Sequence, residues 1–206
     1  AANPHFSDDA PGGIRIVDTN NDGSLTPEDR VALGTPYPDF TWGITNTFQI
    51  KDFDISFLIQ GVQGITVLNG DVYYNETKKW NKKYTKNRWV SAEHPGDGKT
   101  PYQNVKTGHD LMLTDYPLQN ASYACLRNFT VGYTLPATAA RKIKLSGVRF
   151  YVSGSNLLYI WGSGYKGINP ESRMTSGNYS SAMISGYQRG GFPLTSTISA
   201  GFDINF

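Results

Sequence analysis

Residues 194–206 read LTSTISAGFDINF, and from Thr197 onward they alternate without a break between two kinds of side chain. Apolar side chains occupy one parity of the run: Leu194, Ile198, Ala200, Phe202, Ile204 and Phe206. Small or polar side chains occupy the other: Thr195, Thr197, Ser199, Gly201, Asp203 and Asn205. Because successive side chains of a β-strand point to opposite faces, the run predicts a strand with one apolar face that ends on an aromatic residue.

The same alternation recurs earlier in the chain. It fills residues 39–50 and starts again at residue 53, and only the polar pair Lys51-Asp52 separates the two runs. This arrangement predicts a hairpin with a tight turn. Two further strands are expected at about 121–134 and about 147–158, where aromatic and β-branched residues alternate with polar ones. The sequence therefore predicts an all-β fold with about five strands.

The lengths of the strands and of their connections favour one kind of β-fold. The strands approach the ten or so residues of a tilted membrane-spanning strand, whereas strands of globular sheets average five or six. Long connections, at 1–38, about 65–120 and about 159–192, alternate with shorter ones at 51–52 and 135–146. Transmembrane barrels have this asymmetry, with long extracellular loops and short periplasmic turns. We therefore expect residues 1–38 to form an extracellular loop and residues 39–206 to be part of a large antiparallel transmembrane β-barrel.

A soluble extracellular β-sandwich is the alternative. Such a module also has one apolar face on each sheet, so alternation alone does not separate the two folds. With the calcium-type loop described below, this alternative would be a carbohydrate-binding module. The strand lengths and the alternation of loop lengths favour the barrel.

Charge and composition exclude several functions. The net charge is +2 at pH 7, with 19 Lys and Arg against 17 Asp and Glu, so the charge is nearly balanced and does not indicate binding of nucleic acid. One basic cluster exists, and because Asn, Thr and Glu are interspersed we interpret it as a solvated loop: Lys78, Lys79, Lys82, Lys83, Lys86 and Arg88. The single cysteine, Cys125, has no intrachain partner for a disulfide, and we expect it to be a small apolar strand residue.

No catalytic motif is present. The sequence contains no GxSxG, no HExxH and no phosphate-binding glycine-rich loop. Its three histidines, His5, His94 and His109, lie in segments expected to be loops, without a nucleophile motif beside them. We therefore do not expect an enzyme.

Residues 18–29, DTNNDGSLTPED, have the spacing of a calcium loop. Oxygen ligands stand at positions 1, 3 and 5, glycine at position 6 and a carboxylate at position 12, where Asp replaces the usual Glu. The expected ligands are Asp18, Asn20, Asp22, the carbonyl of Ser24, and Asp29. A calcium ion here would rigidify an extracellular loop. The alternative is a plain turn in which Asn and Gly supply left-handed backbone.

The last strand also fits a signal for barrel assembly. Gly201, Ile204 and Phe206 match a pattern of glycine followed by apolar residues that ends on an aromatic one. An exposed edge strand of this kind can pair with the assembly machinery during insertion. Any amphipathic C-terminal strand would match the same pattern.

Two sets of aromatic residues have candidate roles. Those near strand ends suit the aromatic girdles of a membrane interface: Trp42, Tyr133, Tyr159, Trp161 and Phe206. Those in the long loops are of the kind that stacks on sugars, but nothing assigns them to a substrate: Tyr73, Tyr74, Trp80, Tyr84, Trp89 and Trp161. The residues that contact substrate are therefore unknown.

Arg127 interrupts the pattern. In simple alternation it shares a face with Phe129 and Val131, and an arginine facing the middle of a bilayer costs about 2–4 kcal/mol. Either Arg127 lies near the extracellular rim, or a β-bulge changes the parity between Arg127 and Phe129.

Five segments follow one another along the chain: PGGIRIVDTNNDG at 11–23, LGTPYPDFTWG at 33–43, FDISFLIQG at 53–61, SYACLRNFTVGYTLP at 122–136 and VRFYVSGSNL at 148–157. Together, and in this order, they resemble the SusC/RagA family of TonB-dependent outer-membrane transporters. Cys125 departs from the pattern, since the family more often has a basic residue there.

The resemblance implies a fold, a location and a function. It implies that the chain is the C-terminal part of a barrel in the bacterial outer membrane, surrounded by lipid, with the plug and the TonB-contacting segment upstream. It also implies import of nutrient polymers, oligosaccharides or peptides, energised by the TonB complex and assisted by a SusD-like surface lipoprotein.

Overall fold

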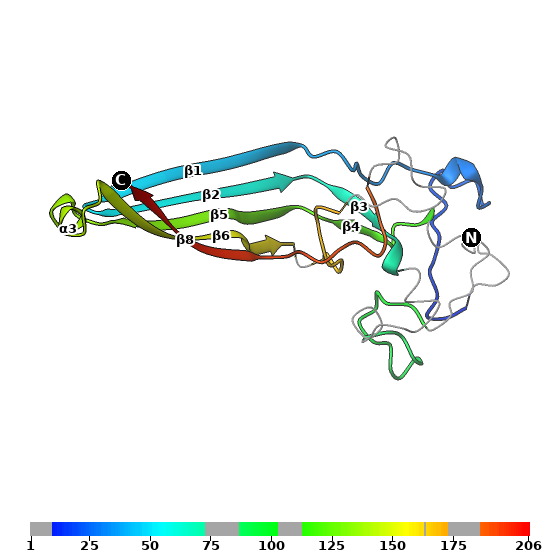
Figure 1. Cartoon of the computed structure of the whole chain (residues 1–206). Helices are drawn as coiled ribbons and strands as arrows, with labels where there is room; N and C mark the ends of the chain where they lie inside the picture. Colours follow the sequence, from blue (N-terminus) through cyan, green and yellow to red (C-terminus); the bar gives the residue numbers. More distant parts are fainter. Residues whose placement is uncertain (1–9, 73–86, 103–112, 163, 173–185) are drawn as a thin grey trace.

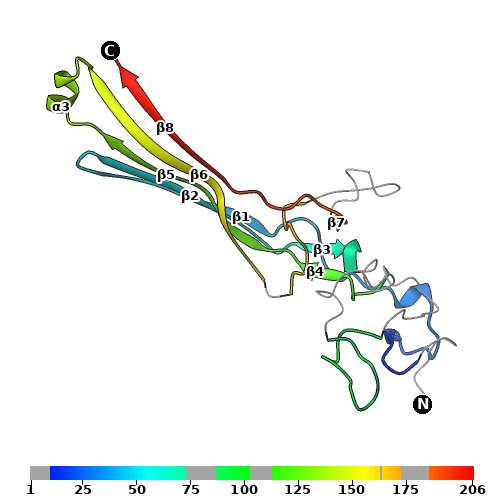
Figure 2. The ribbon, with the colours of Figure 1, turned by 60° about the horizontal axis from the view of Figure 1, so that its bottom comes forward.

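The computed structural model describes residues 10–72, 87–102, 113–162, 164–172 and 186–206. Its main feature is one antiparallel sheet of five long strands in the order β1-β2-β5-β6-β8, which lie side by side in Figures 1 and 2. The strands are β1 (Phe40–Ile50), β2 (Phe53–Gln63), β5 (Tyr123–Thr134), β6 (Gly147–Trp161) and β8 (Thr197–Asn205). All five expected strands are present. The sheet is open within this chain, with β1 and β8 at its edges.

The turn between β1 and β2 is the tight turn that the sequence predicts. Ile50 pairs with Phe53, so only Lys51 and Asp52 connect the strands. Lys51 has φ 54°, the left-handed backbone that two-residue hairpin turns require. The short turn fixes the register along the full length of the hairpin.

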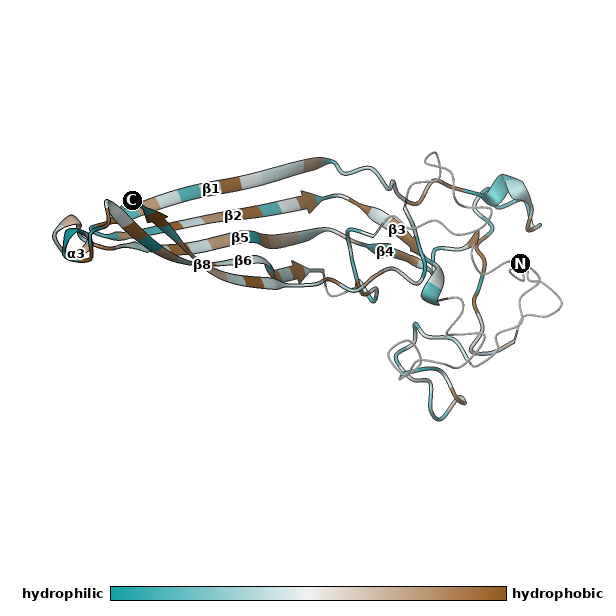
Figure 3. Ribbon diagram, in the orientation of Figure 1, coloured by the Kyte–Doolittle hydropathy of each residue, from teal (hydrophilic) through white to brown (hydrophobic). Residues whose placement is uncertain are grey.

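Cross-strand pairing lines up the apolar side chains in continuous rows, and Figure 3 shows the alternation of hydropathy along each strand. One row contains Ile50, Phe53, Tyr133, Phe150 and Phe202. The next contains Phe48, Ile55, Val131, Val152 and Ala200. Many of these side chains are exposed, for example Phe150 at 51% and Phe202 at 64%. This surface is called the apolar face below.

The opposite surface is the polar face. One of its rows contains Thr47, Ser56, Thr130, Ser153 and Ser199, and the row beside it contains Gln49, Asp54, Gly132, Tyr151 and Gly201. The sheet therefore separates apolar from polar side chains over most of its length.

A pair of bulges resolves the position of Arg127. Pairing with β2 moves from Leu58↔Asn128 to Ile59↔Leu126, so Arg127 is an extra residue in β5. The bulge changes the parity and keeps Leu126 on the apolar face opposite Ile59. Of the two alternatives, the bulge is the one the structure contains.

β6 has its own irregularity at the same level. Leu126 pairs with Leu158 and Asn128 with Ser155, so Arg127 stands opposite two residues of β6, of which Asn156 has φ 55°. β6 therefore has an additional residue where β5 bulges, whereas β2 stays regular, and the side chain of Arg127 turns to the polar face.

The expected long loops are partly folded. They contain β3 (Thr66–Asn69), β4 (Leu118–Asn120) and β7 (Tyr187–Gln188), which form a second sheet in the order β4-β3-β7. The interpretation of 65–120 and 159–192 as loops therefore missed short strands. A buried cluster joins this region to the end of the large sheet: Val62, Ile65, Val67, Ala121, Tyr123, Cys125 and Tyr165. Cys125 is a small buried strand residue, as the sequence predicts.

Two short helical segments lie in the connections, in addition to the helical residues 70–72. Helix α3 (Ala137–Lys142) follows Pro136 in the connection from β5 to β6, where the sequence predicts only a turn. The 3₁₀ segment η1 (Pro27–Asp29) forms the last part of the calcium-type loop, with Thr26 as its N-cap and Pro27 at its first position. Among the described residues, no helix combines the length and the apolar character needed to cross a membrane.

Candidate functional site

The calcium-type loop folds around its own carboxylates. Both oxygens of Asp18 accept backbone N–H groups, Oδ1 that of Asp22 at 3.2 Å and Oδ2 that of Gly23 at 2.9 Å. The amide of Asn20 donates to Asp22 Oδ2 at 2.9 Å, and the N–H of Ser24 donates to Asp22 Oδ1 at 2.7 Å. The first four expected ligands therefore lie in one hydrogen-bonded turn.

Asp29 closes the loop from its other end. Its Oδ1 accepts the N–H of Thr19 at 2.8 Å, and its Oδ2 accepts the N–H of Thr26 at 2.8 Å. Thr26 caps η1 in return, so the two residues form a capping box. The hydrogen bond from Thr26, with those from Thr19 and Asn20, holds the pKa of Asp29 below its usual value despite its burial. Asp29 is therefore a charged anchor that ties η1 to the start of the loop.

Calcium prefers oxygen ligands, and the chemistry of this loop fits that preference. The oxygens of Asp18, Asn20 and Asp22 are adjacent, while Asp29 meets the loop through Thr19. Within the described ranges, no group of three or more His, Cys, Asp or Glu side chains gathers as a metal cluster would. The oxygen atoms of this loop are therefore of the type that calcium binds. In the structure, the carboxylates accept hydrogen bonds from backbone N–H groups of the same loop.

Arg127 is the centre of a polar network on the polar face. It forms an ion pair with Glu171 through Nη2, and its Nη1 donates to Asn156 Oδ1 at 2.9 Å and to Tyr159 Oη at 3.0 Å. Its Nε donates to Gln60 Oε1 at 3.2 Å. The guanidinium also lies 5.8 Å from the centroid of the Tyr159 ring. Three strands and one loop therefore meet at this side chain.

Glu171 belongs to a segment that folds back over the sheet. Burial acts to raise the pKa of Glu171, but the hydrogen bonds and the charge of Arg127 outweigh it, and the pKa lies below the usual value. Residues 164–172, called the strap below, also bond elsewhere: the N–H of Lys166 donates to Gln119 Oε1 at 2.9 Å. Tyr165 Oη donates to Gln188 Oε1 at 2.7 Å. Polar contacts thus fix the strap against the large five-stranded sheet and against the second sheet.

A second ionic cluster lies towards the other end of the polar face. Arg149 forms two hydrogen bonds with Asp54, at 2.6 and 3.0 Å, and one with Asp203 at 3.3 Å. A side chain at Gly132 would collide with this pair, because its Cβ would stand 2.3 Å from Asp54 Oδ1. These ion pairs link β2, β6 and β8.

The three residues of the proposed assembly signal lie in β8 and just after it. Ile204 pairs with Val148 on the apolar face, and Phe206 is 95% exposed. Gly201 lies on the polar face, where a Cβ would stand 2.5 Å from Tyr151 Oη. The glycine therefore has a packing role in the folded sheet besides any role in assembly.

The aromatic predictions have mixed outcomes. Tyr159 and Trp161 lie on the same face of β6 as the Arg127 network, with ring centroids 6.4 Å apart and ring planes tilted by 48°, so their interpretation as an outer girdle is wrong. Trp89 covers Gly12 and contacts Tyr102, with ring centroids 6.4 Å apart. Tyr73, Tyr74, Trp80 and Tyr84 lie outside the described residues, as do Lys78, Lys79, Lys82, Lys83 and Lys86 of the basic cluster.

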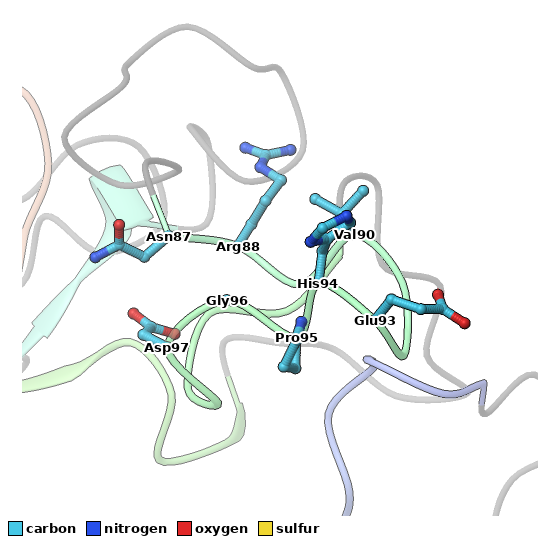
Figure 4. A pocket seen from close by; sticks show the side chains of 8 residues that line it. All are labelled: Asn87, Arg88, Val90, Glu93, His94, Pro95, Gly96 and Asp97. Atoms are coloured by element: carbon cyan, nitrogen blue, oxygen red, sulfur yellow. The ribbon is translucent and has the colours of Figure 1, made fainter.

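A pocket of about 500 Å³ occupies the loop at residues 87–97 (Figure 4). Arg88, Glu93 and His94 are among its lining residues, and their side chains point in different directions. The backbone of His94 pairs with that of Ser91, with N···O distances of 3.0 Å and 3.3 Å, and the His94 N–H also donates to Ser91 Oγ at 3.2 Å. His5 and His109 lie outside the described residues. The pocket therefore brings no catalytic set together.

Long strands, an exposed apolar face and a polar face with ionic networks define the wall of a transmembrane β-barrel. No family model matches the sequence. It is 30% identical to TonB-dependent receptor P3 of Formosa agariphila over 97% of this chain and 19% of that protein. It is 27% identical to TonB-dependent receptor SusC of Bacteroides thetaiotaomicron over 76% of this chain and 15% of that protein. The chain is thus a segment of the TonB-dependent receptor family, whose members are outer-membrane β-barrel proteins.

Solved structures agree with this fold. The RagAB peptide importer in its closed-closed state matches with a TM-score of 0.67 at 19% identity, over 89% of this chain and 19% of the importer chain. The RagAB peptide transporter matches with a TM-score of 0.62 at 21% identity, over 84% of this chain and 18% of that chain. The described sheet therefore has the fold of part of a barrel wall.

We predict that the Arg127–Glu171 pair controls local opening of the strap. Glu171→Gln should lower the free energy of local opening of residues 164–172 by about 1–3 kcal/mol, because a charge-assisted hydrogen bond is lost. Hydrogen exchange in the full receptor measures this. In the wild type the contribution should be present at neutral pH and disappear as pH falls through the lowered pKa of Glu171.

Two further variants make this test specific. Arg127→Gln should have the same effect, and the double variant should add little to either single one. Glu28→Gln, an exposed loop carboxylate, should leave the exchange of the strap unchanged. Fully additive effects of the two single variants would contradict the coupling.

Proposed function

We propose that this chain is part of an importer that carries nutrient polymers across the bacterial outer membrane. The separation of the large sheet into an exposed apolar face and an ion-paired polar face is the observation that carries the proposal. The apolar rows suit contact with lipid, and the polar face suits the interior of a barrel. Homology to TonB-dependent receptors supports energisation by the TonB complex.

The cargo we propose is an oligosaccharide or a peptide, captured with the help of a SusD-like surface lipoprotein. The name SusC of one relative supports this pairing, and RagAB, which shares the fold, is a peptide importer. The chain covers 19% of the length of the first relative. In this proposal, the plug and the contacts with TonB belong to other parts of the full receptor. No step of this function requires a catalytic group in the chain.

The proposed orientation places the strands in the membrane and the loop-rich end outside. Residues 1–38 and the loops at about 65–120 and 159–192 then form the extracellular side, and 51–52 and 135–146 the periplasmic side. The folded second sheet and the Arg127 network support an ordered extracellular rim, since they fix loop segments to the wall. Residues 39–206 are then the barrel part of the chain.

We propose two further roles for residues of the chain. Asp18, Asn20, Asp22, Ser24 and Asp29 would bind a structural calcium ion, which supplies a positive charge among carboxylates that otherwise repel one another. Gly201, Ile204 and Phe206 would form the signal for barrel assembly. The exposure of Phe206 and its place at the end of edge strand β8 support recognition during insertion.

Membrane insertion of the full receptor tests the proposed function. Val152→Arg puts a charge on the apolar face and should cost about 2–4 kcal/mol at mid-membrane depth. Ser153→Arg, the next residue on the polar face, is the matched control and should be tolerated. The measurements are the amount of receptor in the outer membrane and the uptake of labelled oligosaccharides or peptides with and without TonB. A detergent-free soluble monomer of 22.7 kDa would favour the carbohydrate-binding sandwich instead.

Calorimetry tests the calcium proposal. Calcium titrated into the full receptor should bind at a site that Asp18→Asn and Asp22→Asn remove, because each variant deletes a charged oxygen ligand. Asp115→Asn, in a different loop, is the control and should leave binding unchanged. Absence of binding to the wild type, or unchanged binding to both loop variants, would contradict the site.

Insertion kinetics test the assembly signal. Phe206→Ala should lower the fraction of full receptor that reaches its folded, heat-modifiable form, because the terminal aromatic contact is lost. Phe192→Ala, which truncates an exposed aromatic residue outside the strands, should have no such effect. Equal folded fractions for the wild type and Phe206→Ala would refute the role.

A further inference from the structure

The end of the sheet with the short connections carries four exposed cationic side chains. Lys51 lies in the β1–β2 turn, and Arg141, Lys142 and Lys144 lie in and just after α3. Figures 1 and 2 both show α3 and the β1–β2 turn at this same end of the strands. These four residues are called the basic rim. Asp52 is the acidic residue in the same two connections.

The basic rim has no ionic partner within the described part of the chain. The ion pairs found there belong to Arg127 and Arg149, both of which lie on the polar face with carboxylates from other elements. The four rim cations therefore point their charge to the surroundings. A cluster of exposed, unpaired cations attracts anions.

An apolar side chain is exposed in the middle of this cluster. Ile143 is 56% exposed and stands between Lys142 and Lys144. Its position is fixed, because Ala140 is fully buried and the N–H groups of Ile143 and Leu145 both donate to Ala140 O at 3.1 Å. Lys144 has φ 59°, which ends the helix at this point. The turn therefore presents an isoleucine flanked by two lysines.

The rim adjoins the aromatic end of the apolar face. Phe53 and Tyr133, with ring centroids 4.8 Å apart, belong to the last apolar row that crosses all five strands, and Phe150 and Phe202 extend this row across the sheet. Aromatic side chains at this depth mark the boundary between hydrocarbon and headgroups. Lysine and arginine next to such a boundary reach towards the headgroups with their charge and leave their stems in the apolar layer.

We propose that the basic rim is a binding surface for anionic phospholipids. Lys51, Arg141, Lys142 and Lys144 contact the headgroup phosphates of the leaflet that this end of the sheet meets, and Ile143 enters the acyl layer beside Phe53 and Phe150. Guanidinium and ammonium groups both suit phosphate oxygens. The inference rests on the membrane placement of the strands proposed above, and it adds a lipid partner that anchors the short-connection end.

Spin labels in the full receptor, reconstituted in vesicles that contain phosphatidylglycerol, test the position of Ile143. Oxygen concentrates in the acyl layer and a water-soluble nickel complex stays outside it, so the ratio of their collision rates with a label reports its depth. A label on Ile143→Cys should collide more often with oxygen than with the nickel complex. A label on Val90→Cys, in the loop at residues 87–102, should show the reverse, and one on Val152→Cys should lie deeper in the acyl layer.

The three labels separate the two levels of the proposal. Water exposure of the Val152 label would refute the membrane placement itself. A buried Val152 label with an Ile143 label as wet as the one at Val90 would refute the lipid rim alone.

Lipid retention tests the charges. The variant R141Q/K142Q/K144Q should retain several-fold fewer phosphatidylglycerol molecules than the wild type in native mass spectrometry. The variant R15Q/R30Q/K99Q removes the same charge from exposed positions outside the short connections and should retain the wild-type number. The proposal would be overturned if both variants retained the wild-type number of phosphatidylglycerol molecules. It would also be overturned if both variants lost the same number of them.

Discussion

The structure depends on the complete pairing of backbone groups between long strands whose side chains fall on two chemically different faces. In hydrocarbon, backbone N–H and C=O groups must bond within the protein, and antiparallel pairing along β1, β2, β5, β6 and β8 satisfies this for the interior strands. The apolar rows can then face lipid without exposing unpaired backbone N–H or C=O groups to hydrocarbon. The open edges at β1 and β8 require further strands, which a longer receptor of this family would supply.

The bulges at Arg127 and Asn156 preserve this separation where the sequence would otherwise break it. Without the extra residue in β5, either Arg127 or Leu126 would face the wrong environment. With it, the guanidinium reaches Gln60, Asn156, Tyr159 and Glu171 on the polar face. The irregular strand pairing at this level thus has two effects: it keeps the apolar face continuous, and it places Arg127 where it can anchor the strap.

The strands and their faces could be predicted because period-two alternation over nine to fifteen residues is a strong local signal. The hairpin turn at Lys51-Asp52 followed from the same pattern. The short strands β3, β4 and β7, of four, three and two residues, were missed because such runs carry no periodicity. Helix α3 was missed for the same reason, since six residues are too few to show a helical repeat.

The site was predictable only where its residues are close in sequence. Asp18 through Asp29 form one local loop, so their spacing could indicate a shared turn, while a calcium ion bound there stays a prediction. Arg127 and Glu171 lie 44 residues apart, and Arg149 and Asp54 lie 95 apart, so only the strand register and the path of the strap bring them together. Tyr159 and Trp161 keep the parity of Tyr151 in β6, so alternation alone places them on the polar face. Their assignment to an aromatic girdle rested only on their position near the end of the strand. Because both arginine clusters join elements that are distant in the chain, each stabilises the tertiary arrangement of the wall more than any single strand within it.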